Sequence, residues 1–284
     1  MATKKFRCKV CGYVHEGDKA PSVCPVCKAP ASEFEEVMSV QAEGDVQFVP
    51  VKKKLDTNSN TYTLIYAAVM VIVVAFLLAF VNSVLRDRQN ENIKMDTKKQ
   101  ILAALHVDKV ADVNAEFARY VKADRLMNAD GTLGETVDDS QFATSYEKEV
   151  KDNGRLHVFV CEVDGQTKYV IPVYGTGLWG AIWGYVALNA DKNSVYGVYF
   201  SHASETPGLG AEIASKPFFE KFPDKKVLDA AGSSVALGVM KNGKVEDPSS
   251  QVDGISGGTI TSNGVDQMLK KCLSAYMKFL TSKE

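Results

Sequence analysis

The chain has 284 residues, enough for one or two soluble domains with additional segments, and 45% of them are hydrophobic. Its 33 Lys and Arg residues are nearly balanced by 35 Asp and Glu, for a formal net charge of -2, so no basic surface for nucleic acid is indicated and that function class is excluded. Residues 1–23 are polar and lack an apolar core, so no secretory signal is expected there and the N-terminal part should stay in the cytoplasm.

Cysteine is concentrated at the N-terminus, where four of the six cysteines lie within the first 27 residues. They form two pairs, Cys8-x-x-Cys11 and Cys24-x-x-Cys27, separated by twelve residues. Two turns that each supply two thiolates suit a tetrahedral zinc or a single iron. The spacing predicts a metal site rather than a disulfide framework and leaves the metal open, with a structural zinc ribbon the usual occupant of such pairs.

Local detail around these cysteines favours iron. The runs Cys11-Gly12-Tyr13 and Cys24-Pro25-Val26-Cys27, with Phe6 before and Phe34 after them, resemble rubredoxin and the rubredoxin-like domain of rubrerythrins. Glycine beside a ligand lets a backbone N–H turn toward sulfur, and aromatic neighbours exclude water. The resemblance implies a small rubredoxin-like knuckle over residues 1–40, with iron, or alternatively zinc, on the four cysteines.

A long uncharged stretch follows a polar connector assigned to residues 41–60. Residues 57–85 carry no charge, and residues 64–81 are apolar throughout. Because a spanning helix needs roughly 20 such residues, we predict one transmembrane helix over residues 61–85. Basic residues flank it on both sides, among them Lys52, Lys53 and Lys54, so charge alone does not fix its orientation. The spacing of apolar residues then predicts a short helix over residues 96–105.

Residues 86–284 are assigned to one further domain. Residues 156–163 and 168–173 are β-branched and aromatic runs joined around Asp164-Gly165, which predicts a hairpin. Residues 181–188 and 194–201 indicate two more strands of an antiparallel sheet. The last segment is amphipathic, which predicts a terminal helix with Cys272 on its apolar face. The predicted class is α+β, with an antiparallel sheet and flanking helices; residues 108–151 give no clear pattern.

The run Asp253-Gly254-Ile255-Ser256-Gly257-Gly258-Thr259 directly precedes the predicted terminal helix. A flexible turn would explain the glycines and serine. The same glycines would also let a modifying enzyme bind the loop in extended form, which a threonine hydroxyl needs before it forms a phosphoester. A phosphate there would lie near a helix N-terminus, whose free N–H groups and dipole favour anions.

This run resembles the Asp-x-x-Ser-Gly-Ala-Thr signature that flavin transferases recognise in the C subunit of the sodium-translocating NADH:quinone reductase and in the G subunit of the Rnf complex. Gly258 stands where alanine is usual. The resemblance implies FMN covalently bound to the final threonine. The implied attachment loop comprises Thr259, Asp253, Ser256, Gly257, Gly258 and Thr261, with Thr261 the next candidate for attachment.

Two further runs resemble the loops that pack near the flavin in these families. They are Gly175-Thr176-Gly177-Leu178-Trp179-Gly180 and the segment from Ser204 to Glu212. The resemblance implies Leu178, Trp179, Glu205 and Thr206 as the flavin environment. As an alternative, these residues only pack and form turns.

Residues 85–92 and the positions after them resemble the C subunit of the sodium pump more than the Rnf subunit. The resemblance implies an electron-relay subunit of a sodium-translocating NADH:quinone oxidoreductase. Its partners would be the other subunits, a flavin transferase and the bacterial cytoplasmic membrane, with the FMN domain on the outer face. No Gly-x-Gly-x-x-Gly turn follows a strand, so the NADH site is expected on another subunit. The alternatives are the Rnf subunit and a membrane-bound flavin sensor with a zinc ribbon.

Overall fold

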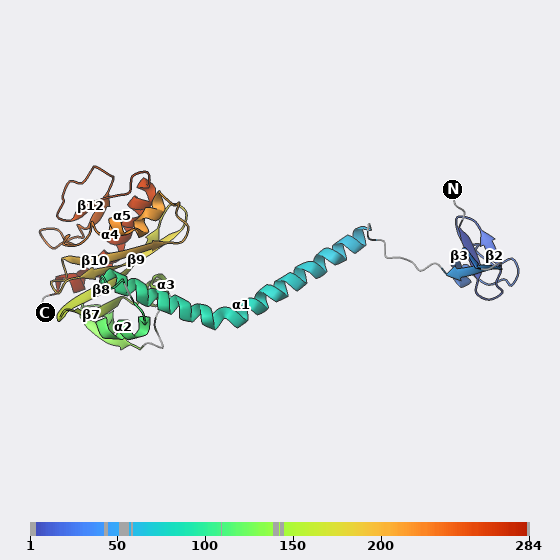
Figure 1. The fold of residues 1–284 in the computed structure, drawn as a ribbon, viewed down its shortest axis with the longest axis horizontal. Helices are drawn as coiled ribbons and strands as arrows, with labels where there is room; N and C mark the ends of the chain where they lie inside the picture. The colour runs from blue at the N-terminus through green and yellow to red at the C-terminus, as the bar shows by residue number, and fades with distance from the viewer. Residues whose placement is uncertain are drawn as a thin grey trace. The chain divides into compact units, whose positions relative to one another are not determined.

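The computed structural model describes residues 4–42, 45–50, 57, 59–108, 110–138, 142 and 145–282. The chain divides into two units, Met1–Val81 and Asn82–Glu284, each with its own internal contacts. The expected α+β class is confirmed, since a four-cysteine knuckle, one long apolar helix and an antiparallel sheet with flanking helices follow one another along the chain (Figure 1).

The first unit contains a small antiparallel sheet with strand order β2-β1-β3-β4. Its elements are β1 (Lys5–Cys8), β2 (Val14–Glu16), a 3-10 turn at Ala31–Glu33, β3 (Phe34–Ala42) and β4 (Asp45–Pro50). Cys8 ends β1 opposite Phe34 of β3, so the sheet holds the first cysteine in place. The buried cluster of this unit is small and includes Cys8, Cys24 and Ala29.

Strands β3 and β4 form a hairpin that extends to Pro50, within the segment that the sequence assigned to a polar connector at 41–60. Val46 and Phe48 alternate with Asp45 and Gln47, a period of two that favours a strand. The polar composition of this segment concealed that alternation. The expected basic group Lys52, Lys53 and Lys54 lies outside the described residues.

The apolar stretch lies in α1 (Asn60–Ala104), one continuous helix of 45 residues. It contains an 18-residue window of mean hydropathy 3.0 with none of it buried, so the helix is long and apolar enough to cross a membrane. The expected short helix over 96–105 is the end of α1 rather than a separate element. No Gly or Pro occurs between Asn60 and Ala104, so nothing in the sequence interrupts the helix.

The second unit is built on a six-stranded antiparallel sheet of order β10-β9-β8-β7-β5-β6. The four predicted strands are confirmed as β7 (His157–Val163), β8 (Gln166–Thr176), β9 (Ala181–Leu188) and β10 (Val195–His202). The predicted turn between β7 and β8 is tight, with positive φ at both Asp164 (51°) and Gly165 (74°). Two such residues define the two-residue turn that matches the twist of paired strands.

The segment without a clear pattern forms four elements: α2 (Val113–Tyr120), β5 (Val121–Met127), β6 (Leu133–Val137) and α3 (Tyr146–Asn153). Asp112 caps α2 by accepting the backbone N–H groups of Asn114 and Ala115 at 3.0 and 3.2 Å. Strand β5 pairs with β7, and the buried carboxylate of Asp124 accepts a hydrogen bond of 3.0 Å from the imidazole Nδ1 of His157. This pair joins the two strands inside the domain.

Alternating side chains divide the sheet into two faces. On β9, Ile182, Val186 and Leu188 contribute to the larger core, while Tyr185 and Ala187 contribute to the smaller one. The end of α1 contributes Ile101 and Ala104 to the smaller core, and Leu105 directly after the helix contributes as well, so this helix anchors directly on the sheet.

The larger core is covered by the C-terminal part of the chain (Figure 1). Its elements are a 3-10 turn at Gly210–Ala214, α4 (Lys216–Phe219), the short parallel strands β11 (Gly238–Met240) and β12 (Gln251–Asp253), α5 (Thr259–Ala275) and α6 (Met277–Thr281). The predicted amphipathic helix is confirmed, although it is divided at Tyr276. Cys272 is buried on its apolar face as expected.

Candidate functional site

One carboxylate joins two loops of the second unit to the start of helix α5. The loop between β8 and β9 carries Trp179, the loop after β10 carries Glu205, and Thr261 lies in the first turn of α5. The backbone N–H of Trp179 donates to Glu205 Oε1 at 2.8 Å, and the hydroxyl of Thr261 donates to Glu205 Oε2 at 2.5 Å. Glu205 is only 5% exposed, and its bond to Thr261 is buried. The three sequence runs that contain Trp179, Glu205 and Thr261 therefore meet at the Glu205 side chain.

The charge on Glu205 is stabilised locally. Burial raises its pKa, but the Thr261 hydroxyl and the backbone N–H groups of residues 178–180 outweigh burial and hold the pKa below its usual value. The backbone N–H of Glu205 itself donates to His202 Nδ1 at 3.2 Å. His202 thus has a structural role in this turn.

Glycine is required where these loops approach Glu205. A Cβ on Gly177 or on Gly210 would lie 2.5 Å from one of the Glu205 carboxylate oxygens. Gly257 has φ of +76°, a conformation that other residues rarely adopt, and a Cβ there would meet Leu209 at 2.8 Å. The glycines of the motif therefore do more than provide flexibility.

Thr259 is the first residue of α5 and is exposed. The N-cap of this helix is Gly258, which has no side chain that could bond to the first turn. The N–H groups of a helix start are unsatisfied without such a cap and favour an anion. Thr261 is 1% exposed, and its hydroxyl is already engaged by Glu205. Of the two threonines, only Thr259 offers an accessible hydroxyl.

The other predicted residues fall into two groups. Asp253 fixes the base of the loop, because its Oδ1 accepts the N–H of Gly243 at 2.7 Å and its carbonyl accepts the Lys221 ammonium at 3.0 Å. Ser256 and Thr206 are exposed. The Thr206 carbonyl accepts two backbone N–H groups and so shapes the turn of its loop.

Four apolar side chains are exposed on the segments that Glu205 joins. Trp179 is 67% exposed and Leu178 47%, and both were predicted. Leu209 (44%) in the loop after β10 and Ile260 (57%) in the first turn of α5 were missed. Ile260 directly follows the threonine, which is the one signal in the sequence that could have identified it. Exposed apolar side chains gathered on several loops indicate a surface that binds something.

The four N-terminal cysteines meet as predicted, with all sulfurs within 4.8 Å of one another. The Sγ atoms of Cys8 and Cys27 are 3.6 Å apart, and those of Cys11 and Cys24 are 3.5 Å apart. All four are free cysteines, and backbone N–H groups such as that of Tyr13 turn toward the sulfurs. Four converging thiolates fit a four-coordinate zinc or iron.

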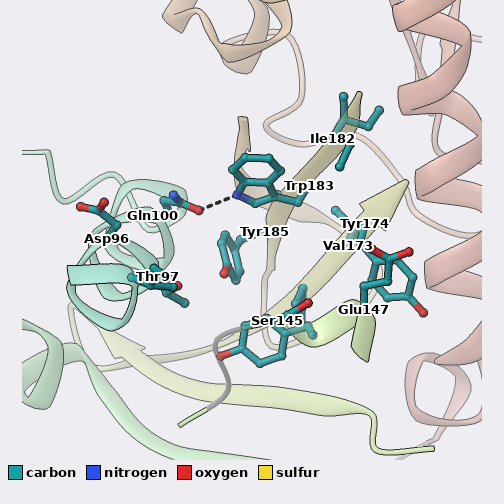
Figure 2. Close-up of a pocket in the computed structure, with 15 residues that line it drawn as sticks. Asp96, Thr97, Gln100, Ser145, Glu147, Val173, Tyr174, Ile182, Trp183 and Tyr185 are labelled. Carbon is teal, nitrogen blue, oxygen red and sulfur yellow. Dashed lines mark hydrogen bonds between the residues drawn. The ribbon is translucent and has the colours of Figure 1, made fainter. Parts of the chain in front are cut away.

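A separate cavity of about 360 Å³ opens between α1, α3 and strands β8 and β9 (Figure 2). Trp183 and Tyr185 lie at its centre, and the indole Nε1 of Trp183 donates to Gln100 at 3.0 Å. The residues predicted for the flavin are not among those that line it. The cavity is therefore distinct from the loops around Thr259.

Known families match both ends of the chain. Residues 177–274 match the FMN-binding domain, and residues 6–35 match the rubredoxin-like domain of rubrerythrin. The first match contains the Glu205 loops and Thr259, and the second contains the four cysteines. The chain is thus a flavoprotein that combines an FMN-binding domain with a four-thiolate metal domain.

Similar proteins of known family define the family of this chain more narrowly. It is 32% identical over 235 residues to the C subunit of the Na(+)-translocating NADH-quinone reductase of Haemophilus ducreyi, covering 76% of this chain and 91% of the relative. The crystal structure of that subunit from Parabacteroides distasonis is 43% identical, covers 70% of this chain and 98% of its own, and superposes with a TM-score of 0.64. The corresponding Shewanella oneidensis structure gives 25% identity and a TM-score of 0.56 over 68% of this chain. The chain belongs to the family of C subunits of the Na(+)-translocating NADH-quinone reductase and carries a rubredoxin-like domain at its N-terminus.

Proposed function

We propose that this protein is the electron-relay C subunit of a sodium-translocating NADH:quinone reductase, with FMN bound to Thr259 through a phosphoester. One observation carries the attachment site: Thr259 is exposed at an uncapped helix start, whereas Thr261 is buried and hydrogen-bonded to Glu205. The hydroxyl of Thr259 would be accessible to a flavin transferase, whereas that of Thr261 is already hydrogen-bonded to Glu205.

The residues around Thr259 fit FMN in two respects. The free N–H groups at the start of α5 suit the phosphate. The exposed apolar residues Leu178, Trp179, Leu209 and Ile260 offer contacts for a flat apolar ring. When bound, the flavin supplies the electron-transfer chemistry, and the protein sets its position and surroundings. Glu205 joins the two loops to the start of α5 and so fixes that position.

For the N-terminal domain, we propose iron on the four cysteines. The buried pair Cys8 and Cys24 and the N–H groups near sulfur give the shielded, hydrogen-bonded surroundings that tune an iron potential. This site would make the protein a subunit with two redox centres.

We further propose that α1 spans the cytoplasmic membrane, with the metal domain inside and the FMN domain on the outer face. The exposed apolar window of α1 supports the span. Four reduced thiolate ligands agree with a reducing interior. Protease added to sealed vesicles of known orientation tests the arrangement, and cleavage of the metal domain from the outer side would contradict it.

The attachment site is tested with Thr259→Val and Thr261→Val variants. A covalent flavin survives denaturation, so the parent protein should give a fluorescent band on a denaturing gel. Thr259→Val should abolish the band, and Thr261→Val should keep it, although weaker loop packing can reduce its intensity. A band that persists in Thr259→Val would move the attachment site elsewhere.

Purification of the protein from its native membrane tests the assignment to a complex. Recovery with several polytopic subunits and NADH:quinone activity supports the relay. A protein recovered alone, whose deletion leaves sodium pumping intact, would instead support a flavin sensor.

A further inference from the structure

The metal-bearing end of the N-terminal unit presents an apolar surface. Val10 and Val26 are each 64% exposed, and Val23 is 50% exposed. Val10 and Val26 lie inside the two Cys-x-x-Cys pairs, and Val23 directly precedes the second pair. Because neighbouring Cα atoms are about 3.8 Å apart and the four sulfurs lie within 4.8 Å, the three valines share one end of the domain. Single exposed valines are ordinary, but three gathered at one metal site form a patch.

This end also gives access to the metal ligands. Cys8 and Cys24 are buried, whereas Cys11 is exposed. A protein that covered the valine patch would therefore contact a ligand residue directly, which shortens the path for electrons.

Cations at the opposite end of the domain are neutralised. At the start of β1, Lys4 pairs with Glu36 at 3.2 Å and Lys5 pairs with Glu16 at 2.8 Å. The four residues of β1 separate these pairs from Cys8 by about 10 Å.

Three cations lie near the valine patch. Lys9 follows Cys8, Lys28 follows Cys27, and the guanidinium of Arg7 lies 3.9 Å from where a Cβ on Gly12 would be. Within the part of the chain that the structure describes, none of these three cations forms an ion pair. Glu33 meets Lys9 through the backbone, because its carbonyl accepts the Lys9 N–H at 2.8 Å. Lys9 is exposed, so its ammonium is accessible to a partner.

We propose that this end of the domain is the docking face for an acidic one-electron carrier protein in the cytoplasm. The valines supply the apolar centre, the exposed Cys11 lies within it, and Arg7, Lys9 and Lys28 form a cationic rim that selects carboxylates on the partner. Opposite charges of this kind raise the association rate and orient the partner. The inference rests on the proposed cytoplasmic location and extends it by naming the class of partner.

Binding to a plant-type [2Fe–2S] ferredoxin, which is acidic, tests the proposal. The full-length protein in lipid nanodiscs is immobilised, and binding is measured by surface plasmon resonance at low and at physiological salt. Lys9→Glu with Lys28→Glu should weaken binding about tenfold or more at low salt. The control Lys19→Glu changes an exposed cation two residues from Gly17, whose N–H bonds to Lys4, so it lies at the far end and should bind as the parent does. The proposal would be overturned if Lys19→Glu lost as much affinity as the Lys9→Glu, Lys28→Glu double variant, or if the double variant lost none.

A second pair of variants tests the apolar centre. Val10→Thr with Val26→Thr keeps the side-chain shape and should weaken binding several-fold with metal content unchanged. Unchanged affinity would contradict the proposed patch. Measurements on the iron-loaded protein separate the two proposals: binding of the reduced carrier without electron transfer would reject the iron relay alone, and failure to bind the carrier would reject the docking face alone.

Discussion

Thr261 donates a hydrogen bond of 2.5 Å to Glu205, and the same carboxylate accepts the backbone N–H of Trp179 at 2.8 Å. One buried side chain thus connects the first turn of α5 to the loops after β8 and β10. Thr259 lies two residues before Thr261, so the geometry of the proposed attachment site depends on a residue that does not itself carry the flavin.

Glu205→Ala should lower the free energy of unfolding of the unit Asn82–Glu284 by about 2–3 kcal/mol, because buried hydrogen bonds to a charged group are lost and their donors stay unsatisfied. Glu205→Gln keeps one carbonyl acceptor and should have a smaller effect. Urea unfolding measures both. A Glu205→Ala variant as stable as its parent would show that the carboxylate does not hold the loops together.

The pH dependence of stability follows from the same carboxyl group. The pKa of Glu205 is lower in the folded protein than in the unfolded chain, so its contribution to stability is present above the unfolded pKa and is lost as pH falls through the folded pKa. Acid should therefore destabilise the parent more than Glu205→Gln over the range below about pH 4.5. Melting temperatures of both proteins between neutral and acidic pH measure the difference. Parallel curves would contradict this assignment.

Gly257 and Gly258 should respond differently to alanine. Gly257→Ala places a Cβ at positive φ and 2.8 Å from Leu209, so it should destabilise the loop by about 1 kcal/mol and reduce flavin attachment. At Gly258 the Cβ would lie 3.1 Å from Ile255 and 3.2 Å from the Leu209 carbonyl, a tight fit that small shifts can relieve. Gly258→Ala should keep the flavin, as measured by in-gel fluorescence. If Gly258→Ala lost more flavin than Gly257→Ala, a feature other than these contacts and the positive φ would explain the glycines.

The buried pair of Asp124 and His157 should matter more than a surface pair on the same sheet. Asp124→Ala leaves His157 buried without its carboxylate and should cost about 3 kcal/mol of stability. Lys122→Ala removes a contact of 4.0 Å to Glu162 between half-exposed side chains and should change stability by less than about 1 kcal/mol. Similar losses in the two variants would show that the buried pair has no special role.

The N-terminal metal gives a prediction visible by eye. Protein from its native host should contain one iron per chain and show a red spectrum that dithionite bleaches. Cys11→Ser replaces the exposed ligand and should shift this spectrum. A colourless protein that contains zinc would leave the FMN as the redox centre and give the four cysteines a structural role.

The sequence predicted the parts of the fold that depend on local patterns. The hairpin turn at Asp164-Gly165, the strands β7 to β10 and the amphipathic C-terminal helix were all identified from short-range alternation. No elements were predicted from the sequence for residues 108–151. Strand β5 there is half polar, and its place in the sheet depends on pairing with β7. The sequence predicts a separate helix at the end of α1 because the pattern of apolar residues changes there, from the apolar window at residues 64–81 to the side chains buried against the sheet.

At the candidate site, sequence resemblance named Glu205 and Thr261 but gave no relation between them. Their hydrogen bond joins residues 56 positions apart, which no spacing rule predicts. Leu209 and Ile260 were missed for a similar reason. The sequence does not tell whether an isolated apolar side chain is buried in the core or exposed, and the structure shows both exposed. The four cysteines were predicted correctly because each pair is local and its ligand spacing is fixed by the turn.

Peptide mass spectrometry tests the central claim most directly. Trypsin should release the peptide from Val245 to Lys270, which contains both threonines. For protein made in its native host, this peptide should be heavier by one FMN less one water, and fragmentation should place the addition on Thr259. An unmodified peptide, or an addition located on Thr261, would contradict the proposed attachment.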